Sequence, residues 1–216
     1  MLSSGTATCP SARGCPPERE LALQLGVSRP SLREALIALE IDGRVEIRMG
    51  SGVYVCVPTQ GTTERETPAV GESPSEMMQA RVVLEGSVLT LAAARVTSHN
   101  LARVRKRLTA MHQDGLQGHT QFENDRGFHT AISEMTGNPV LVRLVDELFD
   151  SRHSPISSRM TARNEDSQAW RAAFVEHEAV YRALKARDPQ AAMTAMCQHL
   201  RASHARWSAE ALLPIT

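Results

Sequence analysis

A carboxylate and an imidazole lie four residues apart in the segment Asp125-x-x-Phe128-His129. Because a helix turns about once every 3.6 residues, these two side chains project side by side from one helical face. Two further imidazoles, His177 and His199, fall within two later segments of helical pattern. An aspartate and three imidazoles converging from three helices would hold Zn²⁺, or a similar ion such as Ni²⁺ or Mn²⁺. The spacing alone does not make them converge, since a lone histidine is more often an ordinary core or surface residue.

A second group of polar side chains lies near the amino terminus. A DNA-recognition helix presents the side chains of its N-terminal end to base edges and phosphates. Arginine forms a bidentate fork with guanine or phosphate, and serine hydroxyls complete contacts to the DNA backbone. The chain offers Arg19, Ser28, Arg29, Ser31 and Arg33. Taken one by one, such residues are more often a solvated helix face.

These residues fall in a segment with the order helix, tight turn, helix and hairpin. Pro16-Pro17-Glu18 is typical of a helix start. A second helix is predicted from Arg29 to Glu40, with Ser28 as its N-cap. Alternating apolar residues on both sides of Met49-Gly50-Ser51-Gly52 predict a short hairpin, whose tip is suited to lie along a minor groove. We therefore predict a winged helix-turn-helix over residues 16–58.

The longer carboxy-terminal segment is patterned as helices separated by caps. Ser73-Pro74-Ser75-Glu76 starts the first helix, and Gly137-Asn138-Pro139 and Asp188-Pro189 each stop one helix and start the next. Short connections between most neighbours are typical of an antiparallel bundle. The predicted helices lie near residues 75–97, 99–116, 120–136, 139–150, 167–186 and 189–210.

Composition divides the chain and limits its class. Residues 1–15 have no periodicity and are predicted to be poorly ordered, and the polar residues 59–73 form a predicted linker. An all-helical domain over residues 74–216 remains, so the expected fold is mainly α. The 24 basic and 24 acidic side chains cancel. Any contact with nucleic acid therefore has to come from a local patch.

The apolar residues give no sign of a membrane or secretion segment. No apolar run approaches the ~20 residues of a spanning helix, and the amino terminus lacks the apolar core of a signal peptide. We therefore predict a cytoplasmic protein without membrane contact. The four cysteines are too few and scattered for a disulfide framework, and all are predicted to be reduced: Cys9, Cys15, Cys56 and Cys197.

The amino-terminal segment resembles the winged-helix head of GntR-family bacterial transcription regulators over residues 16–57. The motifs that carry the resemblance are Pro17-Glu18-Arg19-Glu20-Leu21-Ala22, Leu25-Gly26-Val27-Ser28-Arg29, Arg33-Glu34-Ala35-Leu36, Leu39-Glu40, Gly43, Val45-Glu46 and Gly50-Ser51-Gly52-Val53. The resemblance implies DNA contacts by Arg19, Ser28, Arg29, Ser31 and Arg33, with Gly50 in the wing. Family members usually begin with a further helix and a Pro-Gly turn, and residues 1–15 show neither pattern.

The carboxy-terminal segment is similar to the all-helical, ligand-sensing FCD domain of the FadR-like branch of that family. The matching motifs are Arg81-x-x-Leu84-Glu85, Asp125-x-x-Phe128-His129, Gly137-Asn138, Glu176-His177 and the run from Asp188 to His199-Leu200. This resemblance implies one divalent metal, with Zn²⁺ expected and Ni²⁺ or Mn²⁺ as alternatives. Its implied ligands are Asp125, His129, His177 and His199.

By the same resemblance, the metal keeps positions open for a carboxylate of a small effector, and Arg81 would bind that acid. The alternative role of Arg81 is a structural ion pair with Glu85, four residues later. The run Ser151-Arg152-His153-Ser154-Pro155 resembles regulators of sugar acids of the hexuronate type, which makes Arg152 a second candidate. The remaining histidines are expected on the surface: His99, His112, His119, and also His153 and His204, which lie near the expected pocket.

The sequence therefore predicts a homodimeric regulator, not an enzyme, that binds double-stranded operator DNA and represses a catabolic operon. An alternative is a hydrolase using the same Asp/His cluster, which needs a placed general base. Glu176 and Glu178 flank His177, but helical geometry points them away from its face. A third class, a ligand-binding module with impaired DNA binding, is favoured only by the missing first helix.

Overall fold

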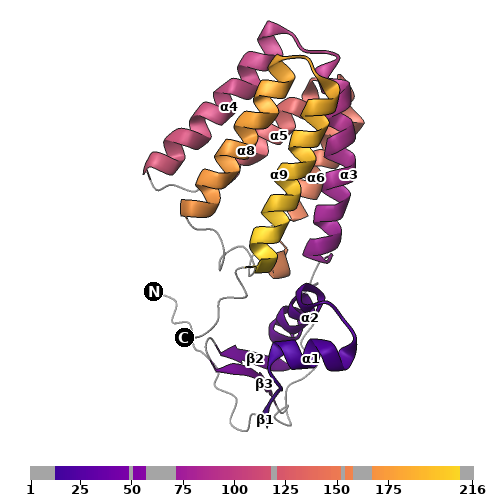
Figure 1. Cartoon of the computed structure of the whole chain (residues 1–216), viewed down its shortest axis with the longest axis vertical. Coiled ribbons are helices and arrows are strands. Elements are labelled where there is room, and N and C mark those ends of the chain that lie inside the picture. Colours follow the sequence, from indigo (N-terminus) through magenta and orange to yellow (C-terminus); the bar gives the residue numbers. More distant parts are fainter. Residues whose placement is uncertain are drawn as a thin grey trace. The chain divides into compact units, whose positions relative to one another are not determined.

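The computed structural model describes residues 13–48, 51–56, 72–117, 121–151, 154–157 and 167–209. They form two compact units that divide between Ser73 and Pro74, and each unit is described by itself. In the described part of the chain the strands belong to one small sheet in the first unit, and the second unit is helical (Figure 1). The predicted fold class, a winged helix-turn-helix followed by an all-helical bundle, is confirmed.

The two helices of the first unit are joined by a tight turn. Helix α1 spans Glu18–Leu25 and helix α2 spans Arg29–Ile41. Gly26 closes α1 with a left-handed φ of 65°, a conformation that glycine adopts without a side-chain clash. Ser28 caps α2, because its Oγ accepts a hydrogen bond from the amide of Ser31 at 3.2 Å.

The wing is a three-stranded antiparallel sheet with the order β1-β3-β2. Strand β2 (Val45–Arg48) pairs with β3 (Gly52–Val55), as the predicted hairpin requires. Strand β1 (Arg13–Gly14) pairs with the other edge of β3. This strand contradicts the predicted poor order of residues 1–15 at Arg13 and Gly14. A two-residue strand held by backbone hydrogen bonds leaves no periodicity in the sequence.

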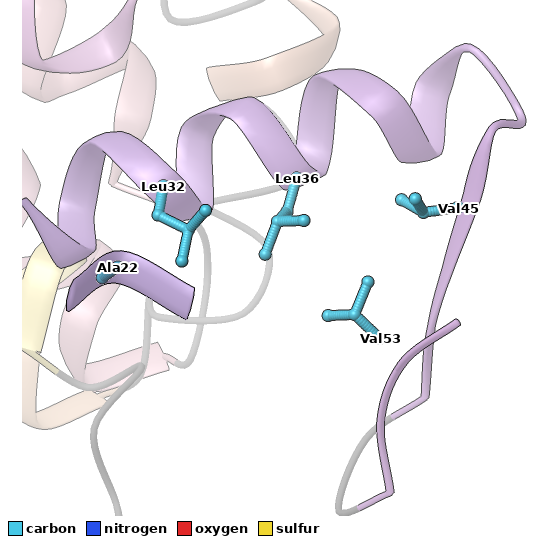
Figure 2. Packing of buried hydrophobic residues seen from close by; sticks show 5 residues of the cluster. All are labelled: Ala22, Leu32, Leu36, Val45 and Val53. Atoms are coloured by element: carbon cyan, nitrogen blue, oxygen red, sulfur yellow. The ribbon is translucent and has the colours of Figure 1, made fainter. Parts of the chain in front are cut away.

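A small apolar core holds α1 and α2 against the sheet. Ala22, Leu32, Leu36, Val45 and Val53 are each at most 8% exposed. Figure 2 shows Leu32 near Ala22 of α1, and Leu36 between Leu32 and the two valines of the strands. Since the two leucines are four residues apart, they share one face of α2. The core therefore fixes how the first turn of α2 is presented to solvent.

Some predictions for the first unit fall outside the described residues or need correction. Gly50 at the wing tip and most of the predicted linker lie outside the described ranges. Cys15 and Cys197 are free thiols, as predicted. Cys56 is disulfide-bonded, which corrects the prediction that all four cysteines are reduced.

The second unit is a bundle of helices that begin and end within a few residues of the predicted ones. In it α3 packs along α9, α9 packs along α8, and α5 contacts α3, α4 and α6 (Figure 1). None of the helices in the described part of the chain is long and apolar enough to span a bilayer. Their bounds are α3 Pro74–Ala93, α4 Ser98–Gln117, α5 Phe122–Glu134, α6 Pro139–Asp150, α8 Ser167–Lys185 and α9 Pro189–Ala209.

The turn between α5 and α6 shows how local sequence sets the bundle. Gly137 has a φ of 64°, and the side chain of Asn138 accepts a hydrogen bond from the amide of Val140 at 3.0 Å. Pro139 occupies the first position of α6, where its missing N–H costs nothing. Gly-Asn-Pro therefore ends one helix and starts the next, as predicted.

Two leucines of α2 provide a test of the head's core. Leu36 is 4% exposed and Leu39 is 37% exposed. We expect Leu36→Ala to lower the free energy of unfolding by about 2–5 kcal/mol, because it leaves a cavity. The matched control Leu39→Ala should cost about 1 kcal/mol or less. Urea unfolding followed by circular dichroism measures both, and equal losses would contradict this core.

Candidate metal centre and nucleic-acid interface

The structure brings the four predicted metal ligands together in the second unit. Asp125 and His129 come from α5, His177 from α8 and His199 from α9. One ligand atom from each residue lies within 4.8 Å of the others. All four residues are buried, with 1% to 4% of their surface exposed. A carboxylate and three imidazoles thus meet in the interior of a helical bundle.

The apolar stripes of the helices explain this convergence. On α8, Ala173, Val180 and Leu184 are buried at helical spacing, and His177 stands in the same stripe. On α9, His199 lies one helical turn from the buried Met196. The histidines therefore occupy positions where a leucine would complete the core. Packing of the stripes carries the imidazoles inward without any local signal in the sequence.

The distances within the cluster fit a shared ion. The Nε2 atom of His177 is 3.0 Å from Oδ1 of Asp125 and 3.4 Å from Nε2 of His129. Two nitrogens bound at about 2 Å to one tetrahedral ion stand about 3.3 Å apart. Nε2 of His129 is also 3.7 Å from the same oxygen of Asp125. The donor set and its spacing are therefore those of a borderline divalent cation.

Two carboxylates, the buried Glu85 and the partly buried Glu176, hold the outer nitrogens of two histidines. Glu85, on α3, contacts Nδ1 of His129. Glu176, on α8, accepts a hydrogen bond from Nδ1 of His199 at 2.8 Å. Such an acceptor keeps the proton on Nδ1 and turns the lone pair of Nε2 toward the cluster. Nδ1 of His177 is buried and has no hydrogen-bond partner among the described residues.

Each of these glutamates is itself paired with an arginine. Nε of Arg81 donates to Oε1 of Glu85 at 2.7 Å. Arg206 donates to both oxygens of Glu176, at 2.7 and 3.0 Å. Burial raises the pKa of Glu85, but the charges of Arg81 and His129 outweigh it and lower the pKa to about 2. The pKa of Glu176 also falls to about 2, because hydrogen bonds from His199 and Arg206 outweigh burial.

The pKa shifts of Asp125 and His199 favour the forms that bind a metal, whereas that of His129 favours its protonated form. Burial raises the pKa of Asp125, but hydrogen bonds from His129 and His177 outweigh it and hold this pKa well below its usual value. Burial and the neighbouring His177 lower the pKa of His199 to about 3. The pKa of His129 is raised, because the charge of Glu85 outweighs the effect of burial. The site thus contains an ionised carboxylate and at least one neutral imidazole.

The contacts of Arg81 bear on both roles predicted for it, an ion pair with Glu85 and the binding of an acid. It is 2% exposed, and its ion pair with Glu85 is the structural alternative. Its guanidinium carbon lies 4.7 Å from the centre of the Phe149 ring. The Nη2 atom is buried and has no hydrogen-bond partner among the described residues. One donor therefore remains for an acid, while Arg152 lies outside the described ranges.

The other histidines do not belong to the cluster or lie outside the described residues. His99 is exposed, and His112 is exposed beside the ring of Phe174, at 4.8 Å between ring centres. Nε2 of His204 lies 3.0 Å from Oγ of Ser75. The remaining two, His119 and His153, lie outside the described residues.

The predicted DNA-contacting residues surround the start of α2. Arg19, Ser28, Arg29 and Ser31 are exposed, and the two serine hydroxyls lie 2.8 Å apart. Arg33 is partly buried and forms an ion pair of 2.5 Å with Glu18 of α1. Arg29 therefore offers the more accessible guanidinium at this end of the helix.

The sequence interpretation missed the contacts of Glu85 and Glu176 with the histidines. The spacing of Arg81 and Glu85 indicated an ion pair but gave no sign of His129. Glu176 was predicted to point away from His177, and its carboxylate instead meets His199 on the next helix. A glutamate beside a ligand histidine is the only local signal for this contact. Since Glu176 is held by an arginine and a histidine, it is not placed as a general base.

Comparison with known proteins identifies the family of both units. The chain matches the description "Bacterial regulatory proteins, gntR family" over residues 15–55. It matches the FCD domain over residues 76–202. The two matches follow the order of the winged helix and the helical bundle along the chain.

The chain aligns with curated relatives over most of their length. The chain is 34% identical over 193 residues to the Uxu operon transcriptional regulator of Escherichia coli K12, covering 86% of this chain and 74% of that protein. It is 31% identical over 206 residues to the HTH-type transcriptional repressor NanR of Cronobacter sakazakii, covering 90% and 76%. The Exu regulon transcriptional regulator of E. coli K12 is 32% identical over 191 residues, covering 86% and 72%.

Solved structures share the fold. The structure titled E. coli McbR/YncC superposes with a TM-score of 0.59 at 21% identity, covering 92% of this chain and 89% of that one. The structure titled Streptococcus agalactiae GntR gives 0.51 at 24% identity, covering 89% of each chain. The matched family and its relatives are regulators, which removes the hydrolase alternative. The chain therefore belongs to the GntR family of bacterial regulatory proteins, with an FCD domain as its helical unit, and is a transcription regulator and not an enzyme.

Proposed function

We propose that this protein is a metal-containing repressor of a catabolic operon that responds to a small carboxylate. The observation that carries the proposal is the buried cluster of one carboxylate and three imidazoles, which come from three helices. The NanR relative is named as a transcriptional repressor, which supports the repressor role. Binding to DNA requires the compartment that holds the chromosome, so we place the protein in the bacterial cytoplasm.

The metal would be held by the four clustered residues, Asp125, His129, His177 and His199. One oxygen and three nitrogens are a donor set suited to Zn²⁺, with Ni²⁺ or Mn²⁺ as alternatives. When bound, the ion would supply open positions for a carboxylate. The residues of this chain hold the ligands in place, and the surrounding apolar side chains exclude water from them.

The effector would be a small acid, and we propose a sugar acid as its class. The Nη2 atom of Arg81 has no hydrogen-bond partner within the described ranges, which supports the binding of a carboxylate beside the metal. Arg152 is a second proposed contact, carried by its sequence motif. The resemblance of the run Ser151-Arg152-His153-Ser154-Pro155 to regulators of hexuronate-type sugar acids supports testing hexuronates first.

The first unit would bind operator DNA through Arg19, Ser28, Arg29, Ser31, Arg33 and Gly50. One winged helix reads few base pairs, and two related by a two-fold axis multiply specificity. We therefore propose a homodimer on a pseudo-palindromic operator. Since the net charge of the chain is zero, only local arginines neutralise phosphates, and the salt dependence of binding should be modest.

Elemental analysis tests the metal. We expect one divalent ion per chain in the purified protein and its loss in the double variant His177→Ala/His199→Ala. Removing the ion with a chelator should lower the melting temperature, because the ion binds only the folded state. The double variant His99→Ala/His112→Ala is the matched control and should retain the metal. Equal metal content in both double variants would rule this site out.

Substitution at the start of α2 tests the DNA interface. We expect Arg29→Ala to weaken operator binding by ~1–3 kcal/mol if the arginine contacts a base. Arg33→Ala should weaken binding too, but it also removes the ion pair with Glu18. Arg143→Ala, on an exposed part of α6, is the control and should bind operator normally. Fluorescence anisotropy with upstream DNA measures all three, and normal binding by Arg29→Ala and Arg33→Ala would overturn the interface.

Arg81→Lys tests the effector site. Lysine retains a charge for the buried Glu85, whereas alanine would leave that carboxylate uncompensated. We expect the variant to bind operator as the wild type does but to lose its response to D-glucuronate or D-galacturonate. Neutral D-glucose serves as the control ligand in the same anisotropy assay. A variant that responds at the wild-type concentration would leave Arg81 as a structural partner of Glu85.

A further inference from the structure

We propose that Glu85 and Glu176 are positioning residues for the metal centre. Each holds one ligand histidine by its outer nitrogen, and each is in turn held by an arginine. The affinity for the metal would then depend on two Arg–Glu pairs that are not metal ligands. This inference rests on the proposed metal site and assigns the residues that orient it.

The first series of hydrogen bonds, Arg81–Glu85–His129, runs from α3 to α5. Glu85 uses Oε1 for Arg81 and Oε2 for Nδ1 of His129. Both partners of the Arg–Glu pair are almost completely buried. An ion pair between residues four apart on one helix would not require the second oxygen to meet a histidine of another helix. The use of both oxygens therefore assigns Glu85 to the orientation of His129.

The second series of hydrogen bonds, Arg206–Glu176–His199, joins α8 and α9. Glu176 precedes His177 on α8 and reaches across to His199, while Arg206 holds both of its oxygens. The rings of the two histidines lie 4.1 Å apart between centres. Glu176 therefore links the two helices at the level where each contributes a ligand. Its side chain remains 22% exposed, so a substitution there disturbs the core less than one at Glu85.

His177 differs from the other two ligand histidines, because no glutamate holds its outer nitrogen among the described residues. Its Nδ1 has no hydrogen-bond partner among the described residues, and its ring packs edge-on against Phe128 at 4.7 Å between centres. Packing thus orients this ring, whereas charged hydrogen bonds orient the other two. A buried Arg–Glu pair is in general a poor source of stability, because the loss of hydration offsets the attraction. Orientation of a metal ligand gives the buried Arg81–Glu85 pair and the partly buried Arg206–Glu176 pair a functional reason.

The test compares three glutamates in the full-length protein. Glu85→Gln and Glu176→Gln remove the charged acceptor but keep the shape of the side chain. Glu178→Gln, on the same helix as Glu176, is the matched control, because Glu178 pairs on the surface with Arg105 at 2.6 Å. Zn²⁺ affinity is measured by competition with a chromophoric chelator, and Co²⁺ is used to record the visible absorption of the site. Circular dichroism of the metal-free proteins verifies that each variant folds.

We expect Zn²⁺ affinity to fall about 10- to 100-fold in Glu85→Gln and Glu176→Gln and to stay unchanged in Glu178→Gln. The Co²⁺ spectrum should change in the first two variants, which a purely structural role would not produce. If Glu85→Gln does not fold, the partly exposed Glu176 decides the outcome, with Arg206→Ala expected to weaken binding as well. Wild-type affinity and spectrum in the Glu176 variant would overturn the positioning role alone. A wild-type protein that binds neither ion would overturn the proposed metal site together with this inference.

Discussion

An aspartate that stays ionised inside a helical bundle needs donors around it, because burial of an unpaired charge costs several kcal/mol. Asp125 meets this condition through His129 on its own helix and His177 on α8. These contacts require α5 and α8 to approach at one level, and His199 adds α9 at the same level. The polar cluster therefore limits how the helices can be packed, although apolar stripes provide most of the buried surface.

The same constraint extends outward. An imidazole that binds a metal through Nε2 carries a proton on Nδ1. Each such N–H must donate a hydrogen bond or stay buried without a partner. Glu85 and Glu176 satisfy two of them, and their charges are in turn balanced by Arg81 and Arg206. Each network thus runs from an arginine through a glutamate to a ligand histidine. Such a network is stable as a whole and sensitive to the loss of one member.

Sequence reasoning predicted the elements better than the contacts between them. The turn at Gly137-Asn138-Pro139 carries its own capping chemistry, so the boundary of two helices could be predicted from three residues. The two-residue strand Arg13–Gly14 has no such signal, because only the open edge of β3 holds it. The convergence of the four ligands was implied by family resemblance, and no spacing along the chain determines which helices become neighbours. The contact of Glu176 with His199 arises between helices, so an argument from a single helix could not predict it.

Helix α9 links the cluster to the start of its own unit. It carries His199, and within the next two turns it carries His204, which contacts Ser75 in the first turn of α3. Ser75 follows Pro74, where the helical unit begins. On the other side of that boundary, Ser73 donates to the buried carboxylate of Glu34 on α2, the helix that presents the predicted DNA contacts. The residues on the two sides of the boundary are thus each held by a helix of their own unit. A displacement of α9 at the ligand level would therefore act first on the first turn of α3, within the helical unit itself.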